Sequence, residues 1–338
     1  MLIIISRILE WRFFGGRDMV AISRQGFTNR RSIAVVAGAV AVSAFASVQT
    51  AQASVTVDGS LDSDYGSALA VQANATGFGT SSGSTPTSAG GSELDAGYGV
   101  VEGSTLYIFL AGDLQTNNNK LDIFIQAGPG GTNTLGSITP NDGNFSNMTG
   151  MKFDPGFAPT TWLSLGSGGT SLYVDYANLV AGTGAYAGSN GPTPSGFVGP
   201  LTGGDVTAPA SLQAALNDSN NTGTVADNMV TTGAEVAISL ADLGYTSGNI
   251  EVSAFINGSN QDYLSNQVLG PFGSGQGNPG GDGVGGYNGT TGDINFGSFA
   301  GTHEFTVTVP APIPEPASMG LLGGLAALML NRRRNRVV

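Results

Sequence analysis

The stretch that decides the fold is "STLYIFLAGDLQTNNNKLDIFIQAG", residues 104–128. Residues 104–114 and 119–128 are both rich in β-branched and aromatic side chains and alternate with a period of two, which is typical of strands. The residues expected on one face of the second run are Leu121, Ile123 and Ile125, and those on the other face are Asp122, Phe124 and Gln126. The polar residues between the two runs favour a turn, so we predict a β-hairpin.

Other strand-like runs follow along the chain, while helical periodicity is nearly absent. The runs are residues 55–57, 95–101, 171–176, 234–239, 249–256 and 303–309. A short helix is expected over 211–219, and a single turn over 239–244 that ends at Gly244. Many strands separated by Gly, Ser, Asn and Pro predict an all-β fold, an antiparallel β-sandwich of jelly-roll-like type. The long Gly/Ser/Asn-rich loops 76–91 and 270–293 have compositions that favour disorder over a functional loop.

Charge is distributed unevenly along the 338 residues. Ten of the twelve basic residues lie near the two ends, whereas residues 54–316 hold two lysines against 22 Asp and Glu, a net charge near −20. A body this acidic repels phosphate backbones, which argues against a nucleic-acid partner, and it suits cations and neutral polysaccharides. The chain has no Cys, so disulfide scaffolds and thiolate metal sites are excluded.

The N-terminal region has the three parts of a secretory signal peptide. They are, in order, the basic Arg30 and Arg31, the apolar signal helix 33–48, and a signal peptidase site at Ala51 and Ala53. The mature chain is then expected to begin at Ser54, and residues 1–18 to be surplus ahead of a start at Met19. Both the general secretory route and the twin-arginine route stay open for export.

The C-terminal stretch "PIPEPASMGLLGGLAALMLNRRRNRVV" joins a short apolar run to a basic end. Its 14 uncharged residues 317–330 would reach about 21 Å as a helix, whereas a membrane core is about 30 Å thick. Such a helix is a marginal anchor, and the arginines would hold its end on the cytoplasmic side. An ordinary tail anchor after a Pro-rich linker is the alternative.

These residues resemble the PEP-CTERM sorting signal of bacteria that have an exosortase. The matching residues are Pro314, Glu315 and Pro316, the apolar run, and Arg332, Arg333 and Arg334. The resemblance implies that an exosortase-like membrane protease cuts near the motif and passes the protein to the cell surface or extracellular matrix. The membrane is then touched only through the sorting helix. The predicted organisation is 1–53 signal region, 54–307 β-sandwich, 308–316 linker with the motif, and 317–338 sorting helix and tail.

Parts of the body resemble known sandwiches. "VTVDGSLDSDYG" (55–66) is similar to the opening strand of carbohydrate-binding family 9-like and DOMON-like sandwiches. "GAEVAISLADLGY" (233–245) is similar to a later stretch of the same sandwiches, with Ser239 where Pro is usual. Residues 94–131 and 254–270 resemble a group of exported PEP-CTERM proteins. These resemblances imply the sandwich fold and carry no ligand with them.

No set of catalytic residues stands out. His303, the only histidine, alternates with Phe305 and Val307 as a strand residue would. The sequence "GTSSG" (79–83) fits G-x-S-x-G but lacks the strand before it and the helix after it. The acidic residues are too numerous for one pair to indicate glycoside hydrolysis. We therefore predict that the protein is not an enzyme.

Two kinds of binding site stay open. The candidate ligands of Ca²⁺ are Asp58, Asp62 and Asp64, although Asp also serves simply as a turn residue. The candidate polysaccharide-binding residues are Trp162, Asn260, Asp262 and Tyr263, with Trp162 more readily explained as a core residue. We expect an exported surface or matrix protein with a non-catalytic, structural or adhesive β-sandwich. The alternatives are a polysaccharide-binding module, with or without calcium, and a hydrolase.

Overall fold

The computed structural model describes residues 54–78, 91–193, 196–219 and 229–311, all of which belong to one compact unit. The predicted signal peptide with Ala51 and Ala53, the sorting motif at Pro314, Glu315 and Pro316, the apolar run, and Arg332, Arg333 and Arg334 lie outside these residues. Within the described part of the chain, no helix has the length and apolar character needed to span a membrane.

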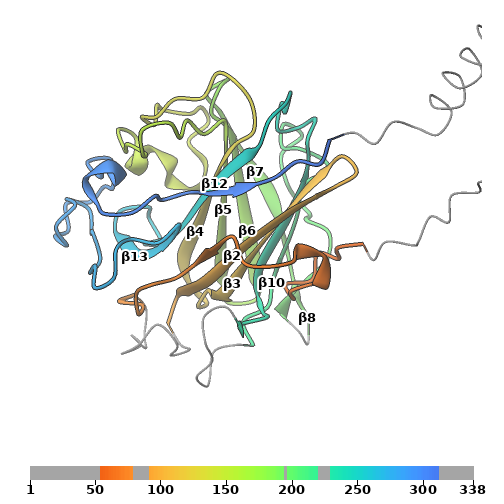
Figure 1. Cartoon of the computed structure of the whole chain (residues 1–338), viewed down its shortest axis with the longest axis horizontal. Coiled ribbons are helices and arrows are strands. Elements are labelled where there is room, and N and C mark those ends of the chain that lie inside the picture. The colour runs from red at the N-terminus through yellow and green to blue at the C-terminus, as the bar shows by residue number, and fades with distance from the viewer. Residues whose placement is uncertain (1–53, 79–90, 194–195, 220–228, 312–338) are drawn as a thin grey trace, which may run out of the picture. The chain divides into compact units, whose positions relative to one another are not determined.

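Two antiparallel sheets face each other, which confirms the predicted all-β sandwich (Figure 1). From edge to edge, the first sheet consists of β1 (Ala70–Val71), β2 (Glu93–Glu102), β3 (Thr105–Asp113), β11 (Gly233–Ser239), β10 (Gln213–Leu216), β9 (Gly196–Phe197) and β8 (Pro192–Thr193). The second consists of β13 (Leu264–Leu269), β12 (Ile250–Asn257), β4 (Asn117–Gln126), β5 (Thr161–Gly168), β6 (Ser171–Asn178) and β7 (Thr183–Asn190), and β14 (Phe305–Val307) also pairs with β12. Short 3-10 helices are η1 (Ser63–Tyr65), η2 (Asp142–Met148) and η4 (Phe296–Ser298).

The space between the sheets is filled mainly by aliphatic side chains. Leu121, Ile123 and Ile125 of β4 all point into it, as the alternation predicted. Leu106 and Ile108 of β3 meet them from the first sheet and are fully buried. Removing this apolar surface from water supplies most of the stabilisation of the sandwich.

The predicted hairpin over 104–128 is wrong. Both of its runs are strands, but β3 pairs with β2 and β11 in the first sheet, and β4 pairs with β5 and β12 in the second. The connection at Leu114 therefore crosses from one sheet to the other. The Leu114 side chain is buried among the inter-sheet residues. A period of two is the same for strands in one sheet and for strands in facing sheets, so the pattern could not separate the two cases.

The remaining element predictions had mixed outcomes. The expected helix over 211–219 is wrong, because this segment contains strand β10, which pairs with β11. The turn over 239–244 is confirmed, and it ends at Gly244 with a φ of 65°. Residues 55–57 belong to no strand, and β1, β5, β7, β8, β9 and β13 were not predicted.

A third layer covers the outer face of the second sheet. Buried aromatic side chains fill the space beneath it, and they come both from the sheet and from the loops over 128–160 and 270–303. Phe296 lies at the centre, with its ring 5.5 Å from Phe255 and 5.9 Å from Phe272. Figure 1 shows the blue loop segment gathered beside β13. The expectation of disorder over 270–293 is therefore wrong, because Phe272 anchors this glycine-rich loop to the core.

The N-terminal segment covers the outer face of the first sheet. Glu235 of β11 is fully buried there and accepts hydrogen bonds from the backbone N–H groups of Asp58 and Gly59, both at 2.9 Å, and from the Tyr65 hydroxyl at 2.8 Å. Burial raises the pKa of Glu235 to about 7, and these donors partly oppose that shift. The contact joins the two stretches, 55–66 and 233–245, that resemble other sandwiches.

Candidate functional site

The predicted polysaccharide-binding stretch forms a tight turn between β12 and β13. Asp262 and Tyr263 lie on its surface and are half-buried, whereas Gln261 between β12 and this pair is fully buried. The Tyr263 ring stacks on Phe78, with ring centroids 6.0 Å apart and planes 13° from parallel. The backbone carbonyl of Asn260 accepts a hydrogen bond from the Asn147 side chain at 2.7 Å. The turn thus presents one carboxyl group and one supported aromatic ring.

A second tyrosine joins these residues from the glycine-rich loop that follows β13. The hydroxyl of Tyr287 donates a hydrogen bond to Asp262 Oδ2 at 3.1 Å, and the hydroxyl of Tyr263 donates one to the Gly285 carbonyl at 3.0 Å. Tyr287 is nevertheless 70% exposed. We call Phe78, Asp262, Tyr263 and Tyr287 the tyrosine patch.

The loop that carries Tyr287 is held in shape by its own backbone. Asp282 Oδ1 accepts hydrogen bonds from the backbone N–H groups of Val284 at 2.9 Å and Gly286 at 2.8 Å, and these donors lower the pKa of Asp282. A Cβ atom at Gly286 would lie 2.1 Å from Asp282 Oδ2, so a larger residue there would displace the Asp282 side chain from these hydrogen bonds. Glycines at 285, 286 and 289 lie close to Tyr287 in the sequence, and most of its side chain is exposed.

The chemistry of the tyrosine patch suits ligand binding. An aromatic face buries large areas of a ligand, and a carboxylate beside it accepts hydrogen bonds that fix the ligand's orientation. The hydrogen bond to Asp262 also raises the pKa of Tyr287. The patch therefore offers an exposed aromatic ring held beside a hydrogen-bond acceptor.

Trp162, the other aromatic candidate, is fully buried in the layer over the second sheet. Its Nε1–H donates to Asp122 Oδ1 at 3.0 Å, and Gln261 Nε2 donates to the same oxygen at 2.8 Å. Burial raises the pKa of Asp122 to about 6. The interpretation of Trp162 as a ligand platform is therefore wrong in this conformation, because its ring packs inside the core and offers no face to a sugar.

The candidate calcium ligands serve as turn-forming residues in the structure. Asp58 Oδ1 accepts the Ser60 backbone N–H at 2.8 Å, and Asp62 Oδ2 accepts that of Thr56 at 2.8 Å. Asp64 lies in η1. Within the described ranges, no three or more His, Asp or Glu side chains are gathered as a metal group. Because Ca²⁺ also accepts backbone and amide oxygens, calcium binding stays a prediction.

His303 fastens the last strand to the aromatic layer. Both its backbone N–H and its Nδ1 lie 2.8 Å from Asp154 Oδ2, and its ring packs against Phe272 and Phe296. The imidazole is buried, and we call this contact the His303–Asp154 clasp. The two contacts with Asp154 and the burial of the ring indicate that His303 holds β14 in place.

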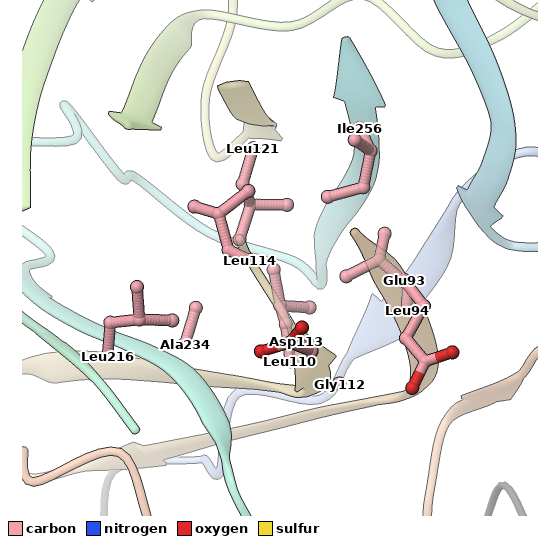
Figure 2. A pocket seen from close by; sticks show the side chains of 10 residues that line it. All are labelled: Glu93, Leu94, Leu110, Gly112, Asp113, Leu114, Leu121, Leu216, Ala234 and Ile256. Carbon is pink, nitrogen blue, oxygen red and sulfur yellow. The ribbon is translucent and has the colours of Figure 1, made fainter. Parts of the chain in front are cut away.

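A cavity lies between the sheets, and Asp113, which lines it, is one of a pair of carboxyl groups with Asp218. Burial and the neighbouring charge of Asp218 raise the pKa of Asp113 to about 7, and burial raises that of Asp218 to about 7. Figure 2 shows the leucine side chains converging on the cavity, with the carboxyl groups of Glu93 and Asp113 at its rim. Its volume of about 10 Å³ is close to the least that holds one water molecule, and it cannot admit a sugar ring.

Sequence reasoning found Asp262 and Tyr263 but missed their two aromatic neighbours. Phe78 and Tyr287 both lie in glycine-rich segments whose composition indicates disorder. The sequence did contain a signal for Tyr287, since it is the only aromatic residue within 273–293.

No protein-family model, curated protein or solved structure matches this chain.

Proposed function

We propose that this chain is an exported, non-catalytic surface protein whose β-sandwich binds extracellular polysaccharide through the tyrosine patch. The observation that carries the proposal is Tyr287, an exposed aromatic ring held in position by a hydrogen bond to Asp262. A ring fixed before binding loses little conformational freedom when a ligand stacks on it. The acidic surroundings of the patch suit ligands without negative charge.

Replacing Tyr287 with Ala should weaken polysaccharide binding by about tenfold or more, because exposed aromatic anchors dominate such contacts. The measurement is retardation of the whole protein in native gels containing neutral or amine-bearing polysaccharides. Val284→Ala is the matched control, since Val284 lies in the same loop and is 88% exposed. Equal retardation of the Tyr287→Ala variant and the unaltered protein by every polysaccharide that is bound would contradict the proposal.

The cellular address of the protein is a separate part of the proposal. It rests on the resemblance of residues 314–338 to a sorting signal. Replacing Pro314, Glu315 and Pro316 with Ala should leave uncut protein in the inner-membrane fraction, because the protease would lose its motif. Fractionation followed by mass measurement of the C-terminus checks this. Release of the altered protein at the same mass and in the same yield would refute it.

A purely structural role is the second candidate. Both outer sheet faces are covered, one by the aromatic layer and the other by the N-terminal segment. Such a body needs no ligand to complete it. This candidate predicts that Tyr287→Ala leaves polysaccharide binding unchanged, so the gel experiment separates the two.

A further inference from the structure

The charged groups around the tyrosine patch are acidic. Asp262 is part of it, Asp282 shapes the Tyr287 loop, and Asp293 accepts a hydrogen bond from Asn288, next to Tyr287, at 3.1 Å. Asp262 Oδ2 accepts the hydrogen bond from the Tyr287 hydroxyl, whereas Oδ1 accepts no hydrogen bond from the described part of the chain. The half-buried Asp262 side chain thus keeps one carboxylate oxygen without a hydrogen bond from the described residues, beside an exposed ring.

Neither lysine of the described ranges forms an ion pair with the carboxylates around the tyrosine patch. Lys120 lies 3.8 Å from Asp175, on β6 of the second sheet. Lys152 is exposed and its backbone pairs beside Asn295, but among the described residues it forms no ion pair with any carboxylate. The described ranges contain no arginine. The three carboxylates of this region, Asp262, Asp282 and Asp293, outnumber the single lysine beside it, which favours a ligand with positive charge.

We infer that the tyrosine patch selects polysaccharides that carry free amino groups. This inference rests on the proposed polysaccharide-binding function and names its ligand class. A protonated amine gains twice at the patch, because a carboxylate oxygen makes a charge-assisted hydrogen bond to it and the face of an aromatic ring attracts a cation. Uronate or sulfate groups would meet repulsion instead.

The test compares two ligands that differ only in acetylation, glucosamine oligomers and N-acetylglucosamine oligomers of equal length, by calorimetry with the whole protein. The free amine should strengthen binding by about tenfold at low ionic strength, and added salt should reduce this preference. Asp262→Asn keeps an oxygen for the Tyr287 hydroxyl and removes the charge. It should abolish most of the preference and leave binding of the acetylated oligomer unchanged.

Asp205→Asn is the matched control, because it makes the same charge change at an exposed position between β9 and β10, outside the patch. An equal loss of preference in Asp205→Asn and Asp262→Asn would show general attraction of a polycation to an acidic protein and would overturn the inference. Equal affinity for the two oligomers would overturn the inferred preference for free amines but would leave the proposed polysaccharide binding in place. Failure to bind either oligomer or any neutral polysaccharide would remove the proposed function as well.

Discussion

Thermal stability should fall as the pH rises from 5 to 8, the reverse of the usual behaviour of acidic groups in folded proteins. Burial raises the pKa values of several carboxyl groups above the ordinary value near 4. They rise to about 7 for Asp113, Asp218 and Glu235 and to about 6 for Asp122 and Asp175. Desolvation of the charged form is the main cause in each case.

The sign of the effect follows from proton binding. Between about pH 4 and pH 7 the folded protein binds more protons than the unfolded chain, so its free energy of unfolding decreases with rising pH and levels off above pH 7. Each pKa unit corresponds to about 1.4 kcal/mol. Since about 1 kcal/mol moves the melting temperature of a domain this size by about 2–4 °C, we expect a decrease of about 10 °C or more between pH 5 and pH 8.

Melting curves by circular dichroism at the two pH values check this expectation. Asp113→Asn should raise the melting temperature at pH 8 and flatten the dependence, because it removes one charge from the Asp113–Asp218 pair. Asp205→Asn again serves as the charge-matched control. A melting temperature at pH 8 equal to or above that at pH 5 would contradict the expectation.

Replacing Phe296 with Ala should destabilise the protein by about 3–5 kcal/mol, the usual cost of removing a phenylalanine from a packed core. The Phe296 ring is fully buried, with ring centroids 5.6 Å from Phe153 and 5.5 Å from His303. Its loss would leave a cavity where the loops 128–160 and 270–303 meet over the second sheet. Chemical denaturation measures the change in the free energy of unfolding.

Hydrogen exchange gives this prediction a second readout. In Phe296→Ala, amides of 291–303 and 151–154 should exchange faster, because the layer over the second sheet loses its centre. Val284→Ala in the same loop should change stability by no more than about 0.5 kcal/mol, as expected for an exposed side chain. A cost below about 1 kcal/mol for Phe296→Ala would show that the layer is not anchored there.

The sequence predicted the fold class because inward-facing residues such as Leu121 and Ile123 repeat with period two in several strands, β4 among them. It failed where a segment has two buried faces. In β13 the polar Ser265 and Gln267 are buried because loops cover both sides of the strand, so no alternation marks it. The helix-favouring residues of 211–219 are drawn into β10 by pairing with β11, which overrides local propensity.

The candidate site could be predicted only in part for a related reason. Asp262 and Tyr263 lie next to a recognisable strand, so their turn was visible in the sequence. Tyr287 depends on a glycine-rich loop whose order comes from distant contacts, such as Asn278 Nδ2 donating to the Gly77 carbonyl at 3.0 Å. Local composition does not contain those contacts, and for the same reason it could not place Glu235 beneath the N-terminal segment.

The position of β14 determines how the fold would respond to mechanical force. This last strand is held by three register pairs with β12 and by the His303–Asp154 clasp just before it. If the protein is tethered through its C-terminal segment, tension enters the sandwich at Val307. The load then falls on β14 and the clasp before it reaches the inter-sheet core, so forced extension of the fold begins at this strand.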